Sequence, residues 1–242
     1  MNDHELAAAI AEEAGQLLRA LRPTIDDPTE LKAAGDARAN VLILDRLATA
    51  RPNDAVLSEE SADDLARLDH ERVWIVDPLD GTREYGEKDR DDWAVHVALC
   101  INGVAAIAAV ALPAQNVVFV TEPAPELRPR ADGAARLVVS RTRPPAITET
   151  LQIALDAELV PMGSAGAKAM AIVQDRADIY AHSGGQYQWD SAAPVAVAAA
   201  AGLHVSRLDG SPLVYNEAER SLPDLLICRP EYADSVLHIT QS

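Results

Sequence analysis

An apolar run that leads into Asp-Pro-Leu-Asp-Gly-Thr constrains the fold of this chain more than any other segment. The β-branched and aromatic residues of Val73–Val76 predict a buried strand. Pro78 keeps Asp77 extended and lacks a backbone donor, so regular strand pairing is expected to stop there. Gly81 then allows the backbone to turn tightly. The segment therefore predicts a buried strand with polar side chains at its carboxyl end.

The residues of this predicted turn are suited to binding a metal ion and a phosphate group. Asp77 and Asp80 can both reach one Mg²⁺ or bridge two, and the carbonyl of Leu79 lies between them. Thr82 can open a helical turn, whose free N–H groups bind phosphate well. The alternative is an ordinary strand-end turn, because Asp, Pro and Gly all favour turns. An apolar strand that leads directly into this motif favours the metal and phosphate site.

Two further acidic positions join this site if the fold brings them close. Glu59 follows a short apolar strand predicted over 55–58, and neighbouring strands would place it near Asp77. Asp190 precedes a helix predicted over 191–201 and fits its N-cap, where a side chain facing a pocket could also ligate a metal. On its own, each position also fits a simpler interpretation, a solvated charge for Glu59 and a helix cap for Asp190.

The first half of the chain predicts two helices before its sheet. Apolar residues recur at helical spacing over Asp3–Leu21. Asp36 could cap a second helix that runs to about Thr49. The sheet that follows is expected to be largely antiparallel, because Asn102-Gly103 is the favoured two-residue hairpin turn between two apolar runs.

The second half predicts alternating strands and helices, which is typical of a layered α/β structure. Residues 121–134 are rich in Pro, Ala, Glu and Arg and are expected to link the two halves. We therefore expect one compact α/β unit in two lobes. An α+β lobe over 1–125 would hold most metal ligands, and an α/β lobe over 134–242 would supply Asp190. The active site would lie in the cleft between the lobes, where ligand sites commonly form.

Charge and composition exclude several classes of function. The 242 residues carry a net charge of −17, so the chain lacks the basic stripe of a protein that binds a nucleic-acid polymer. No run of about 18 uncharged apolar residues occurs, so no membrane span is expected. The acidic first residues lack the basic segment of a signal peptide, which predicts a cytoplasmic protein. Cys100 and Cys228 have no neighbouring Cys or His, so buried free thiols are expected rather than zinc ligands.

Three elements together resemble the inositol monophosphatase superfamily of Mg²⁺-dependent, lithium-sensitive phosphatases. They are the Glu-Glu pair at 59–60, WIVDPLDGT at 74–82 and WDSAAPVAVAAAAG at 189–202. Within the superfamily, SEES, DGTREY and RDDWAVHVAL are most similar to bacterial 3′(2′),5′-bisphosphate nucleotidases, which dephosphorylate 3′-phosphoadenosine 5′-phosphate. The resemblance implies a layered αβαβα sandwich of the sugar-phosphatase type and a role in sulfur assimilation. It also implies two or three bound Mg²⁺ ions, a small phosphorylated substrate and the homodimers that the family often forms.

The resemblance implies a role at each matching position. The metal ligands would be Glu59, Asp77, the Leu79 carbonyl, Asp80 and Asp190. The catalytic residues would be Thr82, Asp36 and Glu59, with Thr82 and Asp36 orienting and helping to deprotonate the attacking water. The residues in contact with substrate would be Gly81, Thr82, Gly163, Ser164, Ala165, Lys168 and Asp190.

The outer part of the pocket is less constrained by the sequence. Lys168, Arg83 and Tyr187 are candidates for holding a second phosphate or a base, although Lys168 also fits a solvated helix lysine. No histidine lies in the three clusters, and His96 is expected to be structural. Water attack assisted by metal ions needs no covalent intermediate.

Other functions fit the same residues less well. A haloacid-dehalogenase-type phosphatase uses an Asp nucleophile in D-x-D-G-T near the chain start, whereas here two residues separate the acids and the motif follows residue 70. Inositol monophosphate and fructose 1,6-bisphosphate are rival substrates, because the metal core is common to these enzymes. A relative that binds divalent metal without catalysis is the alternative outside the enzyme class.

Overall fold

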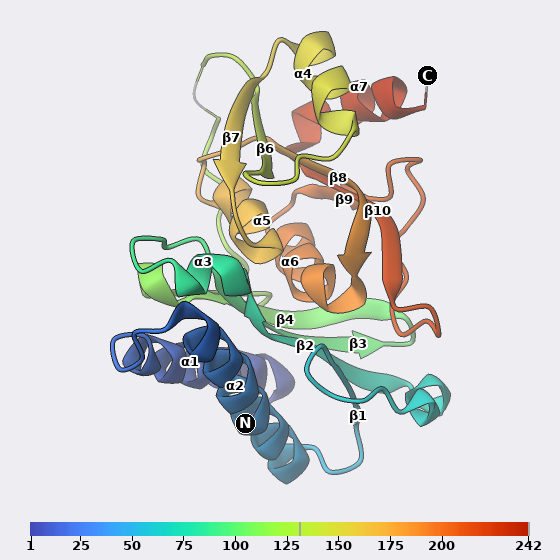
Figure 1. Cartoon of the computed structure of the whole chain (residues 1–242). Coiled ribbons are helices and arrows are strands. Elements are labelled where there is room, and N and C mark those ends of the chain that lie inside the picture. The colour runs from blue at the N-terminus through green and yellow to red at the C-terminus, as the bar shows by residue number, and fades with distance from the viewer. Residues whose placement is uncertain (131, 242) are drawn as a thin grey trace.

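The computed structural model describes residues 1–130 and 132–241, which stack in five layers (Figure 1). Helices α1 (Asp3–Leu21) and α2 (Pro28–Ala50) cover the outer face of a first sheet. Helices α5 (Ala165–Val173) and α6 (Gln188–Ala200) lie between this sheet and a second one. On the outer face of the second sheet lie α4 (Ile147–Leu155) and α7 (Pro230–Thr240). The predicted αβαβα sandwich is confirmed.

The first sheet has the strand order β1-β2-β3-β4-β5. β1 pairs parallel with β2, and every other neighbouring pair is antiparallel. The parallel register sets Ser58 opposite Val76, so Glu59 and Asp77 are the next residues along on two adjacent chains of the sheet. The strands are β1 (Ala55–Ser58), β2 (Arg72–Asp80), β3 (Ala94–Ile101), β4 (Val104–Leu112) and β5 (Val117–Val120).

The hairpin between β3 and β4 follows its turn signal. Asn102 and Gly103 both have positive φ angles, 49° and 81°, as a two-residue hairpin turn of this type requires. Asn tolerates this conformation better than most residues, and Gly adopts it without strain. The antiparallel meander predicted from this pair is therefore confirmed.

The second sheet is mixed and has the order β7-β6-β8-β10-β9. Its members are β6 (Arg136–Ser140), β7 (Glu158–Met162), β8 (Ile179–Tyr187), β9 (His204–Ser206) and β10 (Ser221–Cys228). The remaining short elements are η1 (Leu65–Asp69), α3 (Thr82–Gly86) and η2 (Pro113–Gln115). Along the sequence, the strands of the first sheet come before the segment 121–134 and those of the second sheet come after it. The division into lobes at 1–125 and 134–242 stays a proposal.

Two helices begin earlier than the sequence predicted. Asp27 caps α2 by accepting hydrogen bonds from the N–H groups of Thr29 and Glu30 at 2.9 and 2.8 Å. Pro28 follows it at the first helical position, where a missing donor costs nothing. Asp36 is therefore an internal residue of α2 and not its cap. Asp190 is likewise not an N-cap, because α6 begins at Gln188 and Asp190 lies in its first turn.

The central helical layer packs tightly because α6 is rich in small residues. Its Ala192, Ala193 and Ala198 are fully buried in the core cluster that also contains Ile75 of the first sheet and Leu225 of the second. Burial of apolar surface on both sides of this layer is the main force that holds the two sheets together. The predicted buried free thiols are confirmed at both cysteines. Among the described residues, no helix has the length and hydropathy needed to cross a membrane.

Candidate active site

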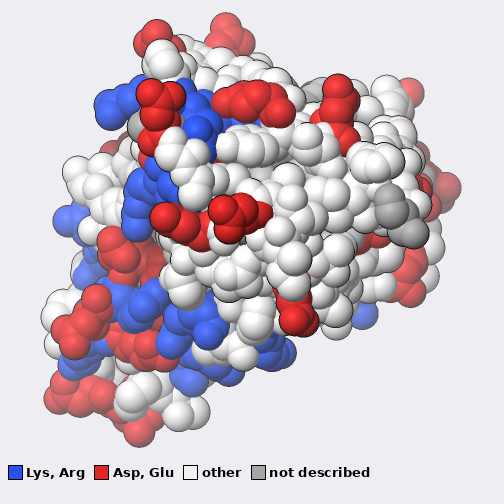
Figure 2. Space-filling view, turned by 90° about the horizontal axis from the view of Figure 1, so that it is seen from above, with Lys and Arg blue, Asp and Glu red and all other residues white. Residues whose placement is uncertain are grey.

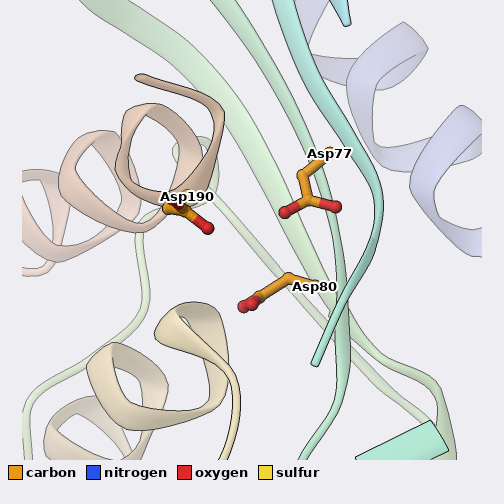
Figure 3. A group of neighbouring side chains, drawn as sticks. All are labelled: Asp77, Asp80 and Asp190. Atoms are coloured by element: carbon orange, nitrogen blue, oxygen red, sulfur yellow. The ribbon is translucent and has the colours of Figure 1, made fainter. Parts of the chain in front are cut away.

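Three aspartates meet between the first sheet and the central helices (Figure 3). Asp77 and Asp80 come from the end of β2, and Asp190 comes from the first turn of α6. One carboxylate oxygen from each of the three lies within 4.8 Å of the other two. Asp77 and Asp80 are buried, and Asp190 is half-buried. The fold therefore brings three of the predicted metal-ligand residues into one cluster.

An irregularity in β2 aims the first two carboxylates. The pairing with β3 breaks between Asp77 and Asp80 and resumes at Asp80, which faces Ala94. Pro78 thus interrupts the ladder as expected but does not end it. The backbone N–H of Leu79 donates to Asp77 Oδ1 at 3.0 Å. The other oxygen, Oδ2, is buried and receives no donor from the described part of the chain.

Asp80 is held on one side only. Its Oδ2 accepts hydrogen bonds from the Ser164 hydroxyl at 2.5 Å and from the Gly166 N–H at 2.7 Å. His96 Nε2 lies 3.3 Å from the same oxygen. All three contacts fall on Oδ2, so the opposite oxygen keeps its lone pairs for a ligand.

His96 lies beside the carboxylates, although the sequence did not place it among the site residues. Its contacts agree with the structural role that the sequence predicted, because they join β3 to Asp80 and to Trp189 of α6. Its Nδ1 lies 3.0 Å from the carbonyl of Trp189, and its Nε2 faces Asp80. Burial opposes the charged form, but these acceptors raise the pKa of His96 on balance. The only available signal was the strand register, which sets His96 opposite Asp77.

Thr82 and Asp36 are neighbours, as the resemblance implied. The Thr82 hydroxyl donates to the Leu79 carbonyl at 2.9 Å and also lies within hydrogen-bond reach of the Asp36 carboxylate. One hydroxyl hydrogen therefore has two acceptors. The Leu79 carbonyl keeps a second lone pair, so its predicted role as a metal ligand remains open to it.

Glu59 faces the aspartates without joining the group of three. Its carboxylate lies against that of Asp77, and Asp80 and Glu60 also act on it electrostatically. Asp190 is positioned separately, because its Oδ2 accepts the Tyr187 N–H at 2.6 Å. With Glu59 the site contains four carboxylates, which have different hydrogen-bond partners, and Glu59 is the most exposed of them.

The crowded carboxylates disfavour their own ionisation. Burial and then the charges of Glu59, Asp80 and Asp190 raise the pKa of Asp77 well above its usual value. Burial and then Asp80 raise the pKa of Asp190 to about 7. Asp80 is the exception, because His96, Lys168 and Ser164 outweigh burial and hold its pKa below the usual range.

This donor set fits divalent metal ions. The oxygens are hard ligands, one of them is buried without a donor, and their negative charges repel one another. A bound cation would supply the missing partner and lower the electrostatic cost of several nearby carboxylates. Asp77, Asp80, Asp190, Glu59 and the Leu79 carbonyl are the residues that would hold it.

We expect the metal-free protein to lose stability as the pH rises from about 4 to about 7. Burial chiefly raises the pKa values of Asp36 and Asp190 to about 7, from ordinary values of 3.8. In that window the folded state binds more protons than the unfolded state, so deprotonation favours unfolding. Thermal unfolding in chelator at pH 5 and at pH 8 measures the difference. The loss should shrink when excess Mg²⁺ is added, and an unchanged difference would contradict this account.

A cavity of about 500 Å³ opens beside the carboxylates and has the size of a small-molecule site. Asp80 and Asp190 form one part of its wall. The predicted substrate-contact residues all line it, and these are Gly81, Thr82, Gly163, Ser164, Ala165, Lys168 and Asp190. Arg83 also lines it, whereas Tyr187 lies outside and stacks on Trp189 with ring centres 4.9 Å apart. The sequence had not pointed to Arg141 and Arg143, which also line the cavity, with Arg141 ion-paired to Glu84 and Glu87.

Lys168 is buried rather than solvated, with 6% of its surface exposed. Its Nζ donates to the Ser164 carbonyl at 2.7 Å and lies over the Tyr180 ring, 5.2 Å from the ring centre. Burial lowers its pKa from the ordinary value, although Asp80 and Asp190 oppose this shift. The alternative interpretation as a solvated helix lysine is therefore wrong.

Gly163 is required by a close approach. A Cβ atom added there would lie 2.2 Å from Glu84 Cδ, and the Glu84 side chain is fixed by Arg141 Nε at 2.7 Å. The Gly163 N–H donates to Asp92 Oδ2. Two predicted substrate contacts thus already have a polar group hydrogen-bonded within the protein, the N–H of Gly163 and the hydroxyl of Ser164.

The face of the molecule that is seen from above is electrostatically mixed (Figure 2). Seen from above, Lys and Arg side chains gather along one side of the molecule and are interspersed with Asp and Glu (Figure 2). This face lacks the continuous basic stripe that a nucleic-acid polymer requires.

Comparison with known proteins places this arrangement in a family. Residues 3–225 match the family model described as the inositol monophosphatase family. The chain belongs to the inositol monophosphatase family. This confirms the resemblance drawn from the three acidic elements, and at the level of reaction class the chain is a phosphatase enzyme of this family.

Two curated relatives of this phosphatase carry nucleotidase names. A Mycobacterium bovis protein is 54% identical over 235 residues, covering 93% of this chain and 88% of its own length, and is named 3′-phosphoadenosine 5′-phosphate phosphatase. An Escherichia coli protein is 32% identical over 201 residues, covering 78% of this chain and 81% of its own length. It is named 3′(2′),5′-bisphosphate nucleotidase CysQ.

A solved structure supports the family fold. CysQ from Bacteroides thetaiotaomicron superimposes with a TM-score of 0.80 at 24% identity, covering 94% of this chain and 97% of that one. The inositol monophosphatase from Anabaena superimposes with a TM-score of 0.79 at 21% identity, covering 98% and 94%. At these identities the likeness concerns the fold alone.

Proposed function

We propose that this phosphatase removes the 3′-phosphate of 3′-phosphoadenosine 5′-phosphate and releases AMP and phosphate. The observation that carries the proposal is a cavity lined both by the carboxylates of Asp80 and Asp190 and by the basic side chains of Lys168, Arg141 and Arg143. The carboxylates suit metal ions, and metal ions held there would bind the phosphate that is cleaved. Lys168, Arg141 and Arg143 suit a second phosphate on the same molecule. The names of the relatives with 54% and 32% identity support the same substrate.

The chain's own residues supply binding and proton transfer in this reaction. Asp77, Asp80, Asp190 and Glu59 would hold two or three Mg²⁺ ions, which neutralise phosphate charge and lower the pKa of bound water. Thr82 orients the attacking water and accepts its proton while passing its own hydrogen to Asp36. The pKa of Asp36, raised to about 7 chiefly by burial, suits a proton acceptor near neutral pH.

The bond changes balance without a covalent enzyme intermediate. The water oxygen forms a bond to phosphorus, and the bond between phosphorus and the 3′-oxygen breaks. The departing oxygen takes a proton from solvent, and the proton on Asp36 returns to solvent after release. Lys168 sits between Ser164 and Tyr180, where its charge can stabilise the departing or second phosphate.

Phosphate release under matched conditions tests this proposal. The substrates are 3′-phosphoadenosine 5′-phosphate, inositol 1-phosphate and fructose 1,6-bisphosphate, each with Mg²⁺ and with chelator. We expect Mg²⁺-dependent release with kcat/KM highest for the nucleotide. Faster turnover of a sugar phosphate would keep the metal site and change the substrate. Metal binding without release from any substrate would favour the non-catalytic alternative. A homodimer and a cytoplasmic location stay predictions.

A further inference from the structure

One wall of the cavity carries a buried amide with an unused acceptor. Gln186, at the end of β8, lines the cavity and has only 6% of its surface exposed. Its Nε2 donates to the Tyr180 hydroxyl at 2.7 Å. Its Oε1 is buried and receives no hydrogen bond from any residue that the structure describes. Buried amide oxygens are nearly always paired, so this atom is poised for a partner from outside the chain.

The amide is fixed by a chain of contacts that begins at the carboxylates. Ser164 donates to Asp80 through its hydroxyl and accepts from Lys168 through its carbonyl. Lys168 lies over the ring of Tyr180, whose hydroxyl holds the Gln186 amide. Each link is buried. The Gln186 side chain is therefore held by buried contacts in the wall of the same cavity as Asp80 and Asp190.

A second acceptor on the same strand supports this interpretation. His182 also lines the cavity, four residues before Gln186, and its Nε2 is buried without a partner in the described residues. Its other ring nitrogen is hydrogen-bonded to the backbone of Gly184. Burial and the charge of Lys168 lower the pKa of His182, which favours the neutral ring, whose Nε2 then accepts a hydrogen bond. Two buried, unpartnered acceptors on one strand of the cavity wall predict a ligand that brings hydrogen-bond donors.

We propose that Gln186 is a specificity-determining residue that accepts a hydrogen bond from a donor on the nucleoside half of the substrate. This inference rests on the proposed function. Phosphate oxygens and the ring nitrogens of adenine carry no such hydrogen, so two groups remain. They are the exocyclic amino group of the base and the 2′-hydroxyl of the ribose.

Two substrate analogues distinguish these donors. In 3′-phosphoinosine 5′-phosphate a carbonyl oxygen replaces the amino group, and the 2′-deoxy analogue of the parent nucleotide lacks the ribose hydroxyl. We expect the wild-type protein to have a kcat/KM at least about tenfold lower for one analogue than for the parent. Gln186→Leu should slow the parent reaction and reduce that ratio to about two or less. The analogue that shows the effect identifies the donor.

Two further variants keep the test decisive. Tyr180→Phe keeps the Gln186 side chain but removes the hydroxyl to which its Nε2 donates, so the amide can rotate. The ratio of kcat/KM between parent and analogue should then lie between the values of the wild type and of Gln186→Leu. Gln174→Leu is the matched control, because Gln174 has the same unpartnered Oε1 and an Nε2 bonded to Gln115, but lies outside this cavity. This control should keep the full ratio. Thermal unfolding checks that each variant is folded.

The outcomes separate this inference from the proposed function. If the wild-type protein does not hydrolyse the parent nucleotide, the proposed function fails. If it hydrolyses the parent but treats both analogues alike, the inference about Gln186 is wrong. The inference is also wrong if folded Gln186→Leu and Tyr180→Phe variants keep the wild-type ratio.

Discussion

Replacing Asp77 by asparagine should reduce phosphate release by about a thousandfold or more at saturating Mg²⁺. The variant keeps an oxygen for the Leu79 N–H but loses the charge that a divalent ion needs. Because burial and three nearby carboxylates raise the pKa of Asp77, the same change should stabilise the protein in chelator at neutral pH. Initial rates of phosphate release and thermal unfolding measure the two effects.

The combination of lower activity and higher metal-free stability is the signature of this site. A fold defect would lower both quantities. Asp45→Asn, an exposed residue of α2, is the matched control and should change neither. Activity within tenfold of the wild type would remove Asp77 from the proposed metal ligands.

Replacing Thr82 by valine should lower kcat by about 10²- to 10³-fold with little change in KM. Valine keeps the shape of threonine but cannot pass a hydrogen between water and Asp36. Asp36→Asn should give a loss of similar size, because both residues belong to one proton path. Steady-state kinetics of the two variants and of the double variant test this.

The double variant decides whether the two residues act as a unit. Residues that share one step lose about as much together as either loses alone. Losses that multiply would mean that Thr82 and Asp36 act independently. In that case the bond from the Thr82 hydroxyl to the Leu79 carbonyl, at 2.9 Å, would be the more important contact.

The sequence predicted best what is encoded locally. The turn after β2 depends on Pro78 and Gly81, and the hairpin depends on Asn102 and Gly103, so short segments sufficed for both. The predicted start of α2 was wrong, although the sequence signal for the true start is also local. Asp27 and Pro28 form the capping pair at the start of α2, whereas Asp36 is also a residue type that caps helices but lies inside this one.

The rest of the site depends on how separate layers meet. His96 reaches Asp80 only because β3 pairs with β2 in one register. Lys168 is buried because α5 packs against Tyr180 of the second sheet. No motif predicts that the Oε1 atom of Gln186 lacks a partner among the described residues, because its orientation depends on the hydrogen bond from Nε2 to Tyr180. Patterns within one segment cannot predict such contacts.

The placement of the carboxylates between layers has a consequence for folding. Asp80 belongs to the first sheet, but two of its hydrogen bonds come from the start of α5, far along the chain. A chain in which only one sheet has formed cannot assemble this environment. Loss of activity and loss of tertiary structure in denaturant should therefore follow one common transition, and catalytic competence reports completion of the whole fold.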